Sequence, residues 1–195
     1  MLSHQLTPSG EYKVKVEYNV LIPMRDRVSL SANIYRPDSQ GQFPVLLLRT
    51  PYNKNVEENI DEIKLARHGY VVVVQDVRGR HDSEGTFYPF LNEANDGFDS
   101  QRWCATREWS NGIMGGIGRS YYGITQLLPA MHGSSMLKAM NPVVTSSDVY
   151  KDWLYPDGAF ALEFALVWGA TYIDARTNQA IEIGDWEKNF RHLPL

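Results

Sequence analysis

Three features of the sequence predict an α/β protein, with a mostly parallel sheet and helices on both faces. Short, continuous apolar runs are typical of strands that are covered on both sides. Segments with the apolar spacing of helices lie between these runs, and the two kinds of segment alternate along the chain. Such alternation indicates strand–helix–strand units. Near the N-terminus, a period-two pattern adds an antiparallel hairpin.

Each predicted element has its own local sequence pattern. Two alternating segments flank a turn at residues 24–27 and form the hairpin. Continuous apolar runs then predict buried strands, and the first predicted helix ends at Gly69, as helices commonly do. The predicted strands are residues 12–22, 28–35, 44–50, 70–76, 112–118 and 137–144, and the predicted helices are residues 57–68 and 124–131.

Composition excludes several classes of protein. The chain has 195 residues, of which 43% are hydrophobic, as expected of one globular domain. Its formal charge of −4 gives no reason to expect nucleic acid or an anionic membrane as a partner. The apolar stretch 159–173 is shorter than the roughly 18 residues of a membrane span and predicts a buried or interfacial helix. No secretory signal is visible at the start, so a cytoplasmic protein is expected.

The strongest chemical signal is the segment Gly118-Arg-Ser-Tyr-Tyr-Gly123, between a strand-like and a helix-like run. A serine at a sharp strand-to-helix turn projects its hydroxyl above the sheet, and the next backbone N–H points to where an oxyanion would form. The spacing G-x-S-x-x-G is one residue longer than G-x-S-x-G, which is the commoner spacing of such a strand-to-helix turn, the nucleophile elbow. The context favours Ser120 as a nucleophile, and the alternative is a tight turn with an ordinary serine.

Other polar residues favour structural roles. Asp76, Arg78 and the loop 80–84 indicate a charge-paired loop rather than a metal site, which needs converging ligands. Cys104, the single cysteine, excludes an internal disulfide and is expected to be a buried thiol. The glycines at 115–118 are not a dinucleotide fingerprint, because Tyr121 stands at the third glycine position. We therefore expect no metal and no cofactor.

Five ordered segments carry a family resemblance: Arg49–Tyr52, Gln75–Gly79, Ser83–Phe87, Glu93–Gly97 and Gly118–Gly123. With them, the chain resembles the cocaine esterase and X-prolyl dipeptidyl peptidase family of α/β-hydrolases, which includes the α-amino-acid ester hydrolases. The resemblance runs from about residue 12 to about residue 168. It implies a serine acyl hydrolase that acts on small-molecule esters or on peptides.

The resemblance also implies site residues. Ser120 corresponds to the nucleophile, Tyr52 to a tyrosine whose hydroxyl binds the oxyanion, and Tyr121 to the second donor through its backbone N–H. Tyr122 and Trp168 correspond to positions that line the acyl pocket. From the residues alone, Tyr52 is equally well a turn tyrosine after Pro51. Tyr122 and Trp168 are equally well core aromatics.

A serine hydrolase of this fold takes its triad in the order Ser, Asp or Glu, His. In the family, the acid and the base follow a helical cap. This sequence ends at Leu195, within what resembles the start of that cap, so neither has a counterpart here. We expect residues 1–145 to be the N-terminal part of the hydrolase domain and residues 146–195 to begin the cap.

A local triad is not favoured. His132 is expected to end the helix that runs away from Ser120, and His192 lies in a polar tail. No spacing selects one of the candidate acids Asp148, Asp152, Asp157, Asp174 and Asp185. A catalytically silent remnant that binds a ligand or a partner therefore stays open as an alternative. The strand 137–144 would then be an uncovered sheet edge, through which the chain could form a homo-oligomer or bind another chain.

Overall fold

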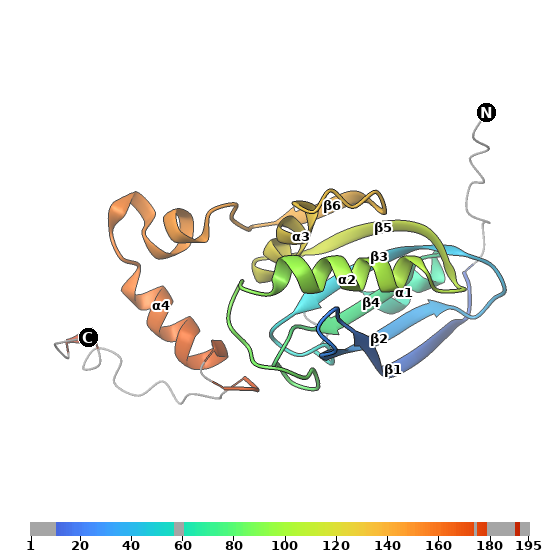
Figure 1. Ribbon diagram of the computed structural model, residues 1–195, viewed down its shortest axis with the longest axis horizontal. Coiled ribbons are helices and arrows are strands. Elements are labelled where there is room, and N and C mark those ends of the chain that lie inside the picture. The colour runs from blue at the N-terminus through green and yellow to red at the C-terminus, as the bar shows by residue number, and fades with distance from the viewer. Residues whose placement is uncertain (1–10, 57–60, 174, 179–189, 192–195) are drawn as a thin grey trace.

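The computed structural model describes residues 11–56, 61–173, 175–178 and 190–191, and Figure 1 shows the arrangement of its elements. Six strands form one sheet in the order β1-β2-β4-β3-β5-β6. The strands are β1 (Val14–Pro23), β2 (Ser29–Pro37), β3 (Phe43–Thr50), β4 (Val71–Asp76), β5 (Ser110–Arg119) and β6 (Leu137–Val143). Strands β4, β3, β5 and β6 run parallel, whereas β1 and β2 are antiparallel to their neighbours. The α/β class, the hairpin and the mostly parallel sheet are confirmed.

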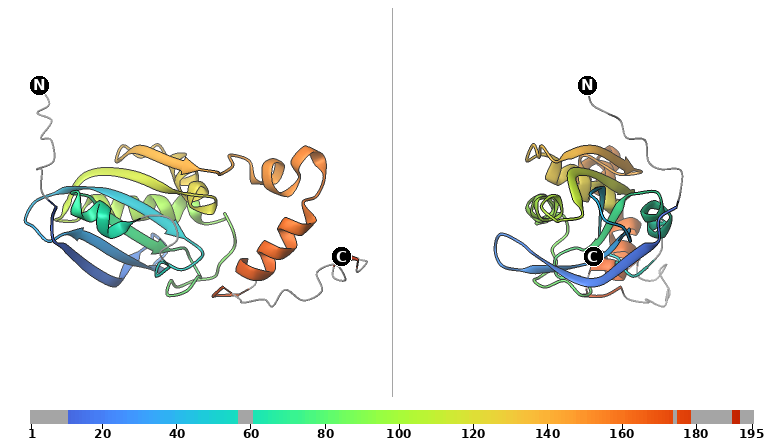
Figure 2. Two further views of the ribbon diagram at one scale, coloured as in Figure 1. Left: turned by 180° about the vertical axis from the view of Figure 1, so that it is seen from behind. Right: turned by 90° about the vertical axis from the view of Figure 1, so that its right-hand side faces the viewer.

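Helices cover both faces of the sheet (Figures 1 and 2). The helices that pack on the sheet are α1 (Glu62–Arg67), α2 (Glu93–Ala105) and α3 (Tyr121–Ala130). Strand β4 shows why both faces must be covered, because all six of its residues are buried. Val71 and Val73 belong to the core that includes Cys104 of α2, while Val72 and Val74 belong to the core against which Leu65 of α1 packs. Successive strand residues point to opposite faces, so one valine run supplies both cores.

The helices begin at different residues from those expected. Helix α3 starts at Tyr121 rather than Ile124, directly after Ser120. Helix α1 begins after Asp61, whose carboxylate accepts a hydrogen bond from the Lys64 N–H and so caps it. The earlier part of the predicted helix 57–68 lies outside the described residues.

The segment after β6 extends beyond the end of the sheet instead of packing on its faces (Figures 1 and 2). It contains η1 (Tyr150–Leu154), η2 (Pro156–Gly158), α4 (Leu162–Trp168) and η3 (Gly169–Ile173). The apolar stretch 159–173 therefore forms two joined helical pieces, and none of the residues in them is fully buried. Among the described residues, no helix combines the length and the apolar content that crossing a membrane requires.

Candidate active site

Ser120 occupies the sharp turn between β5 and α3. Its backbone is in an unusual conformation, with φ 55° and ψ −126°, of a kind that concentrates at functional sites. The Ser120 N–H donates to the carbonyls of Val143 and Val144 at 2.9 and 3.1 Å, and the Thr145 hydroxyl donates to the Ser120 carbonyl at 2.8 Å. The end of β6 and the two residues after it therefore hold the backbone of the turn.

Two glycines make this turn possible. Gly118 has φ +133°, and a Cβ there would lie 2.5 Å from Tyr122 Cβ. At Gly123, a Cβ would lie 2.5 Å from Thr145 Cβ. Both distances are far below ordinary contact, so the spacing G-x-S-x-x-G reflects close approach of the chain on each side of the serine.

The N-terminus of α3 supplies one candidate oxyanion donor. Tyr121 is the first residue of α3, and the first N–H groups of a helix have no acceptor within it. The Tyr121 N–H directly follows Ser120 in the chain, which is the position of an oxyanion-hole donor in α/β-hydrolases. The helix dipole adds partial positive charge at the same end.

Tyr52 approaches the serine from the turn after β3. Burial raises the pKa of its phenol to about 12, although side-chain interactions with Trp168 and Ser120 lower it. The Trp168 indole N–H donates to the Tyr52 hydroxyl at 3.0 Å. The phenol is therefore neutral at physiological pH and still has a proton to donate beside Ser120.

The turn that carries Tyr52 is fixed by polar contacts. The Lys54 N–H donates to Asp76 at 2.7 Å, and the Lys54 ammonium binds both Asp76 and Asp82. The buried Arg80 guanidinium donates to the Pro51 carbonyl at 2.8 Å. The backbone before and after Tyr52 is thus held by side chains from other segments, which reduces the motion of the phenol.

A cavity of about 350 Å³ opens above the serine. Two tryptophans and a phenylalanine give it an aromatic wall, and Asp152 adds a carboxylate. The Ser146 hydroxyl donates to Asp152 at 2.6 Å. The residues that line this cavity are Tyr52, Ser120, Val144, Asp152, Trp153, Phe164 and Trp168. An aromatic pocket with few polar groups is typical of a site for a small organic ligand.

The structure thus brings Ser120, Tyr52 and Trp168 together around one cavity. Tyr122 lies differently: it is 6% exposed and belongs to the core with Leu48, Val72 and Val74. Its ring packs edge-on against Tyr52, with 5.5 Å between the ring centroids. Tyr122 therefore supports the Tyr52 ring from the side of the core.

Beneath the elbow lies a buried polar network that sequence reasoning missed. Glu93 accepts a hydrogen bond from Arg49 Nη1 at 2.7 Å and another from the Tyr121 hydroxyl at 2.9 Å. Burial raises the pKa of the Glu93 carboxyl, and it raises the pKa of the Tyr121 phenol well above its usual value. Arg49 is the residue from which this network could have been predicted. It is a charged residue near the end of a largely apolar strand, and a buried charge requires a partner.

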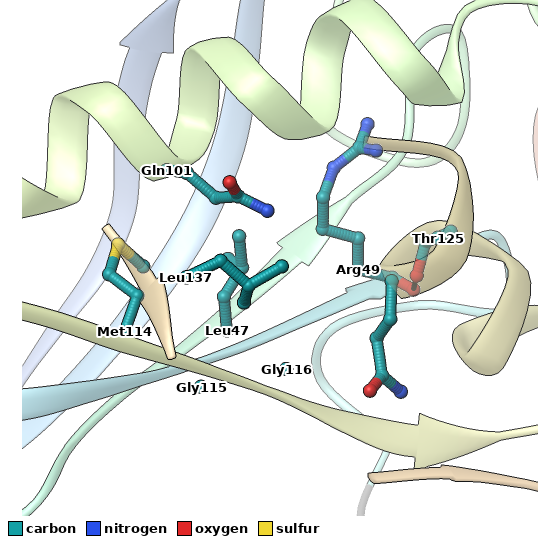
Figure 3. A pocket seen from close by; sticks show the side chains of 9 residues that line it. Leu47, Arg49, Gln101, Met114, Gly115, Gly116, Thr125 and Leu137 are labelled. Atoms are coloured by element: carbon teal, nitrogen blue, oxygen red, sulfur yellow. Dashed lines mark hydrogen bonds between the residues drawn. The ribbon is translucent and has the colours of Figure 1, made fainter. Parts of the chain in front are cut away.

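A small internal cavity of about 10 Å³ lies beside this network, between the sheet and helices α2 and α3 (Figure 3). Arg49 extends from β3 toward α2, and Gln101 extends from α2 toward the sheet. Arg49 Nη2 and Gln101 Oε1 are buried and make no hydrogen bond within the described residues. A volume of this size is about that of one water molecule.

The charged loop after β4 is ion-paired, as expected. Arg78 binds Asp26 at 2.8 Å and Asp96 at 2.7 Å. In the described part of the chain, no group of three or more histidine, cysteine and acidic side chains could hold a metal ion. Cys104 is buried as predicted, and burial raises the pKa of its thiol to about 12.

The described histidines lie away from the cavity wall. His81 Nε2 lies 3.2 Å from the Pro51 carbonyl oxygen, on the turn that carries Tyr52. His132 follows α3, as expected, and packs against Phe98 with 5.1 Å between ring centroids. His68 is the C-cap residue of α1. His192, the other histidine considered for a local triad, lies outside the described residues.

The α/β sheet and the sharp strand-to-helix turn at Ser120 are typical of the α/β-hydrolase fold, and comparison with known proteins identifies the family. The sequence profile of the X-Pro dipeptidyl-peptidase (S15) family matches residues 26–192. Cocaine esterase from Rhodococcus sp. (strain MB1 Bresler) is 40% identical over 167 residues, which are 83% of this chain and 29% of that protein.

Solved structures of hydrolases from the same family also resemble this chain. A CocE/NonD family hydrolase from Staphylococcus aureus superposes with a TM-score of 0.67 at 31% identity, over 70% of this chain and 28% of that one. An α-amino-acid ester hydrolase superposes with a TM-score of 0.72 at 27% identity, over 89% of this chain and 32% of that one. The chain belongs to the S15 family, and it spans less than a third of the length of these relatives.

Proposed function

We propose that this chain supplies the nucleophile and the oxyanion site of a serine acyl hydrolase that cleaves esters or amides. Ser120 Oγ attacks the acyl carbonyl carbon and gives its proton to the base of the triad. The bond between the acyl carbon and the leaving oxygen or nitrogen then breaks, the alcohol or amine leaves with that proton, and an acyl-enzyme remains. The Tyr52 hydroxyl and the Tyr121 N–H bind the oxyanion of the tetrahedral intermediate. The observation that carries this proposal is the meeting of the strained Ser120 turn, Tyr52 and the aromatic cavity.

We propose that the acid and the base of the triad come from outside the described residues, since no described histidine lines the cavity at Ser120. Loss of the triad histidine costs on the order of a million-fold in turnover. We therefore expect the chain by itself to be acylated slowly and to turn over poorly. Residues 146–195 are proposed to begin a helical cap, and the acid and the base are proposed to come from polypeptide beyond these residues.

The aromatic side chains that line the cavity at Ser120 favour substrates with an apolar acyl group. Trp153, Phe164 and Trp168 offer aromatic surface to an apolar acyl group. Asp152 places a negative charge in the wall of the same cavity. We therefore propose small esters or amides with an aromatic or aliphatic acyl group as substrates.

The test is covalent labelling of the folded 195-residue chain with p-nitrophenyl acetate, followed by intact mass measurement and peptide mapping. We expect one acetyl group on Ser120. The Ser120→Ala variant, shown to be folded by circular dichroism, should remain unlabelled at this peptide. A folded chain without an adduct on Ser120 would contradict the proposal, as would equal labelling of the variant.

A second candidate role is association with another chain, which the edge of the sheet favours. Strand β6 is the last strand in the sheet order, and Met140 and Val143 on it are 41% and 42% exposed. Exposed apolar edge strands readily pair with other chains. Light scattering across a concentration series tests this role: a mass that rises with concentration, and that falls back in Val143→Lys, would support it. A monomer at every concentration would exclude self-association through this edge.

A further inference from the structure

The hydrogen bond between Trp168 and Tyr52 has a fixed direction. An indole N–H can only donate, whereas a phenol oxygen can both donate and accept. Trp168 Nε1 lies 3.0 Å from Tyr52 Oη, so the phenol oxygen must be the acceptor at this contact. The phenol's own proton therefore points away from the indole.

The indole itself is held firmly in this position. Its ring lies nearly parallel to Phe164 and to Phe90, with interplanar angles of 8° and 12° and centroids 5.9 and 6.2 Å away. Trp168 is also the last residue of α4, where the helix passes into η3. Stacked neighbours restrict the rotation of the indole plane, so its N–H has little freedom to leave the phenol.

The Tyr52 ring is restrained as well. Tyr172 of η3 packs edge-on against it with 4.9 Å between centroids, and Tyr122 does the same with 5.5 Å. The ring position is therefore fixed by packing, and only the C–O–H torsion remains free to rotate. In a free phenol this proton would turn toward any acceptor within reach.

We propose that Trp168 is a positioning residue that orients the hydroxyl proton of Tyr52 toward the oxyanion site at Ser120. This proposal rests on the proposed function, because it concerns the oxyanion donor of that reaction. By occupying a lone pair of the phenol oxygen, the indole N–H leaves the O–H directed into the rest of the cavity, which Ser120 also lines. Donors oriented before the reaction need no reorganisation as charge develops, which is the main source of oxyanion stabilisation.

The competing explanation is that Trp168 is only an aromatic wall of the pocket. A double-mutant cycle separates the two, because a wall contributes equally whether residue 52 carries a hydroxyl group or not. The measured quantity is the rate of acetylation of Ser120 by p-nitrophenyl acetate. Trp168→Phe keeps an aromatic ring and removes the indole N–H.

We expect Trp168→Phe to slow acetylation about tenfold, the size of one hydrogen bond's contribution, and to change the KM for the ester much less. In the Tyr52→Phe background, the same substitution should have almost no effect. The matched control is Trp153→Phe, which removes the other tryptophan of the same cavity. Its effect, whatever its size, should be equal in both backgrounds. Equal slowing by Trp168→Phe in both backgrounds would overturn the proposal.

A spectroscopic measurement tests the hydrogen bond on which the proposal depends, whether or not acylation occurs. In the ¹H–¹⁵N spectrum, the indole signal of Trp168 is identified by its absence from Trp168→Phe. We expect Tyr52→Phe to move this signal upfield, as the indole loses its acceptor, and to leave the Trp153 signal in place. An unmoved Trp168 signal would refute the hydrogen bond and with it the proposal. A moved signal without acylation of the wild type would refute the proposed function, and with it the orienting role of Trp168, while the hydrogen bond itself would stand.

Discussion

Glu93 Oε2 lies 2.7 Å from Arg49 Nη1, and the two side chains are 3% and 1% exposed. The same carboxylate accepts a hydrogen bond from the hydroxyl of Tyr121, the residue after Ser120. One buried ion pair therefore joins the end of β3, the start of α2 and the start of α3. These are three of the elements that meet beneath the Ser120 turn.

Removal of one charge from this pair should destabilise the fold strongly. Glu93→Gln keeps the size of the side chain but leaves Arg49 without its nearest carboxylate, and breaking a buried pair typically costs about 3–5 kcal/mol. We expect a loss of about 3 kcal/mol in the free energy of unfolding, because Asp96 lies 4.0 Å from Arg49 and compensates in part. Urea titration followed by circular dichroism measures this change.

The control for this prediction is Glu17→Gln. Glu17 pairs with Arg36 at 2.7 Å, but their side chains are 37% and 19% exposed. Pairs near the surface contribute roughly 0–1 kcal/mol, so this variant should unfold almost like the wild type. Equal losses in the two variants would contradict a special role for the buried pair.

The close approach at Gly123 should not tolerate a methyl group. In Gly123→Ala the new Cβ would lie 2.5 Å from Thr145 Cβ, and such overpacking costs typically about 1–3 kcal/mol. Because Thr145 also holds the Ser120 carbonyl, acetylation of Ser120 should slow as well. Thermal unfolding and the labelling rate measure the two effects.

Gly169→Ala is the matched control for Gly123→Ala. No atom lies within 4 Å of a Cβ built at Gly169, and alanine favours a helix over glycine. We expect its stability to be unchanged or slightly higher. A loss comparable to that of Gly123→Ala would show that the effect does not come from the contact with Thr145.

The free energy of unfolding should fall at acidic pH because the Asp99 carboxylate becomes protonated. Burial by itself would raise the pKa of this carboxyl, but hydrogen bonds from Arg25 outweigh it and hold the pKa below the usual 3.8. A carboxyl with a lowered pKa in the folded state stabilises the protein above its unfolded-state pKa, and this contribution is lost as the pH falls through the folded-state value. The stabilisation should therefore be constant from pH 7 to about pH 5 and decline below about pH 4.

Asp99→Asn removes this dependence. Because Arg25 is about half exposed, we expect a cost of only about 1 kcal/mol near pH 7. The urea unfolding curves of the variant and the wild type should converge between about pH 4 and pH 2. A difference between the two proteins that persists at the lowest pH would contradict this assignment.

Cys104 should not react with thiol reagents while the protein is folded. Its side chain is fully buried, and burial raises the pKa of the thiol to about 12, whereas the thiolate is the reactive form. At pH 8, 5,5′-dithiobis(2-nitrobenzoic acid) should leave the native chain unmodified and modify one thiol rapidly in urea. Rapid modification of the native chain would show that the packing around α2 opens.

The local sequence was sufficient to predict the fold class and the Ser120 turn. Alternating and continuous apolar patterns specify which face of a strand is buried, and glycines around Ser120 specify where the chain can turn tightly. These are short-range properties, so they can be recognised from neighbouring residues. The helix after Ser120 was placed three residues late, because the pattern of apolar residues does not show where the first turn begins.

Only the tertiary structure decided which distant side chains meet at the site. Trp168 binds Tyr52 across 116 positions of sequence, and Arg49 binds Glu93 across 44. Tyr122, for which both a pocket position and a core position were open, packs into the core and against the Tyr52 ring. Periodicity assigns residues to faces of helices and strands, but it does not specify how those faces pack against one another. That packing depends on the path of the whole chain, and it determined the cavity, its aromatic wall and the contact between Trp168 and Tyr52.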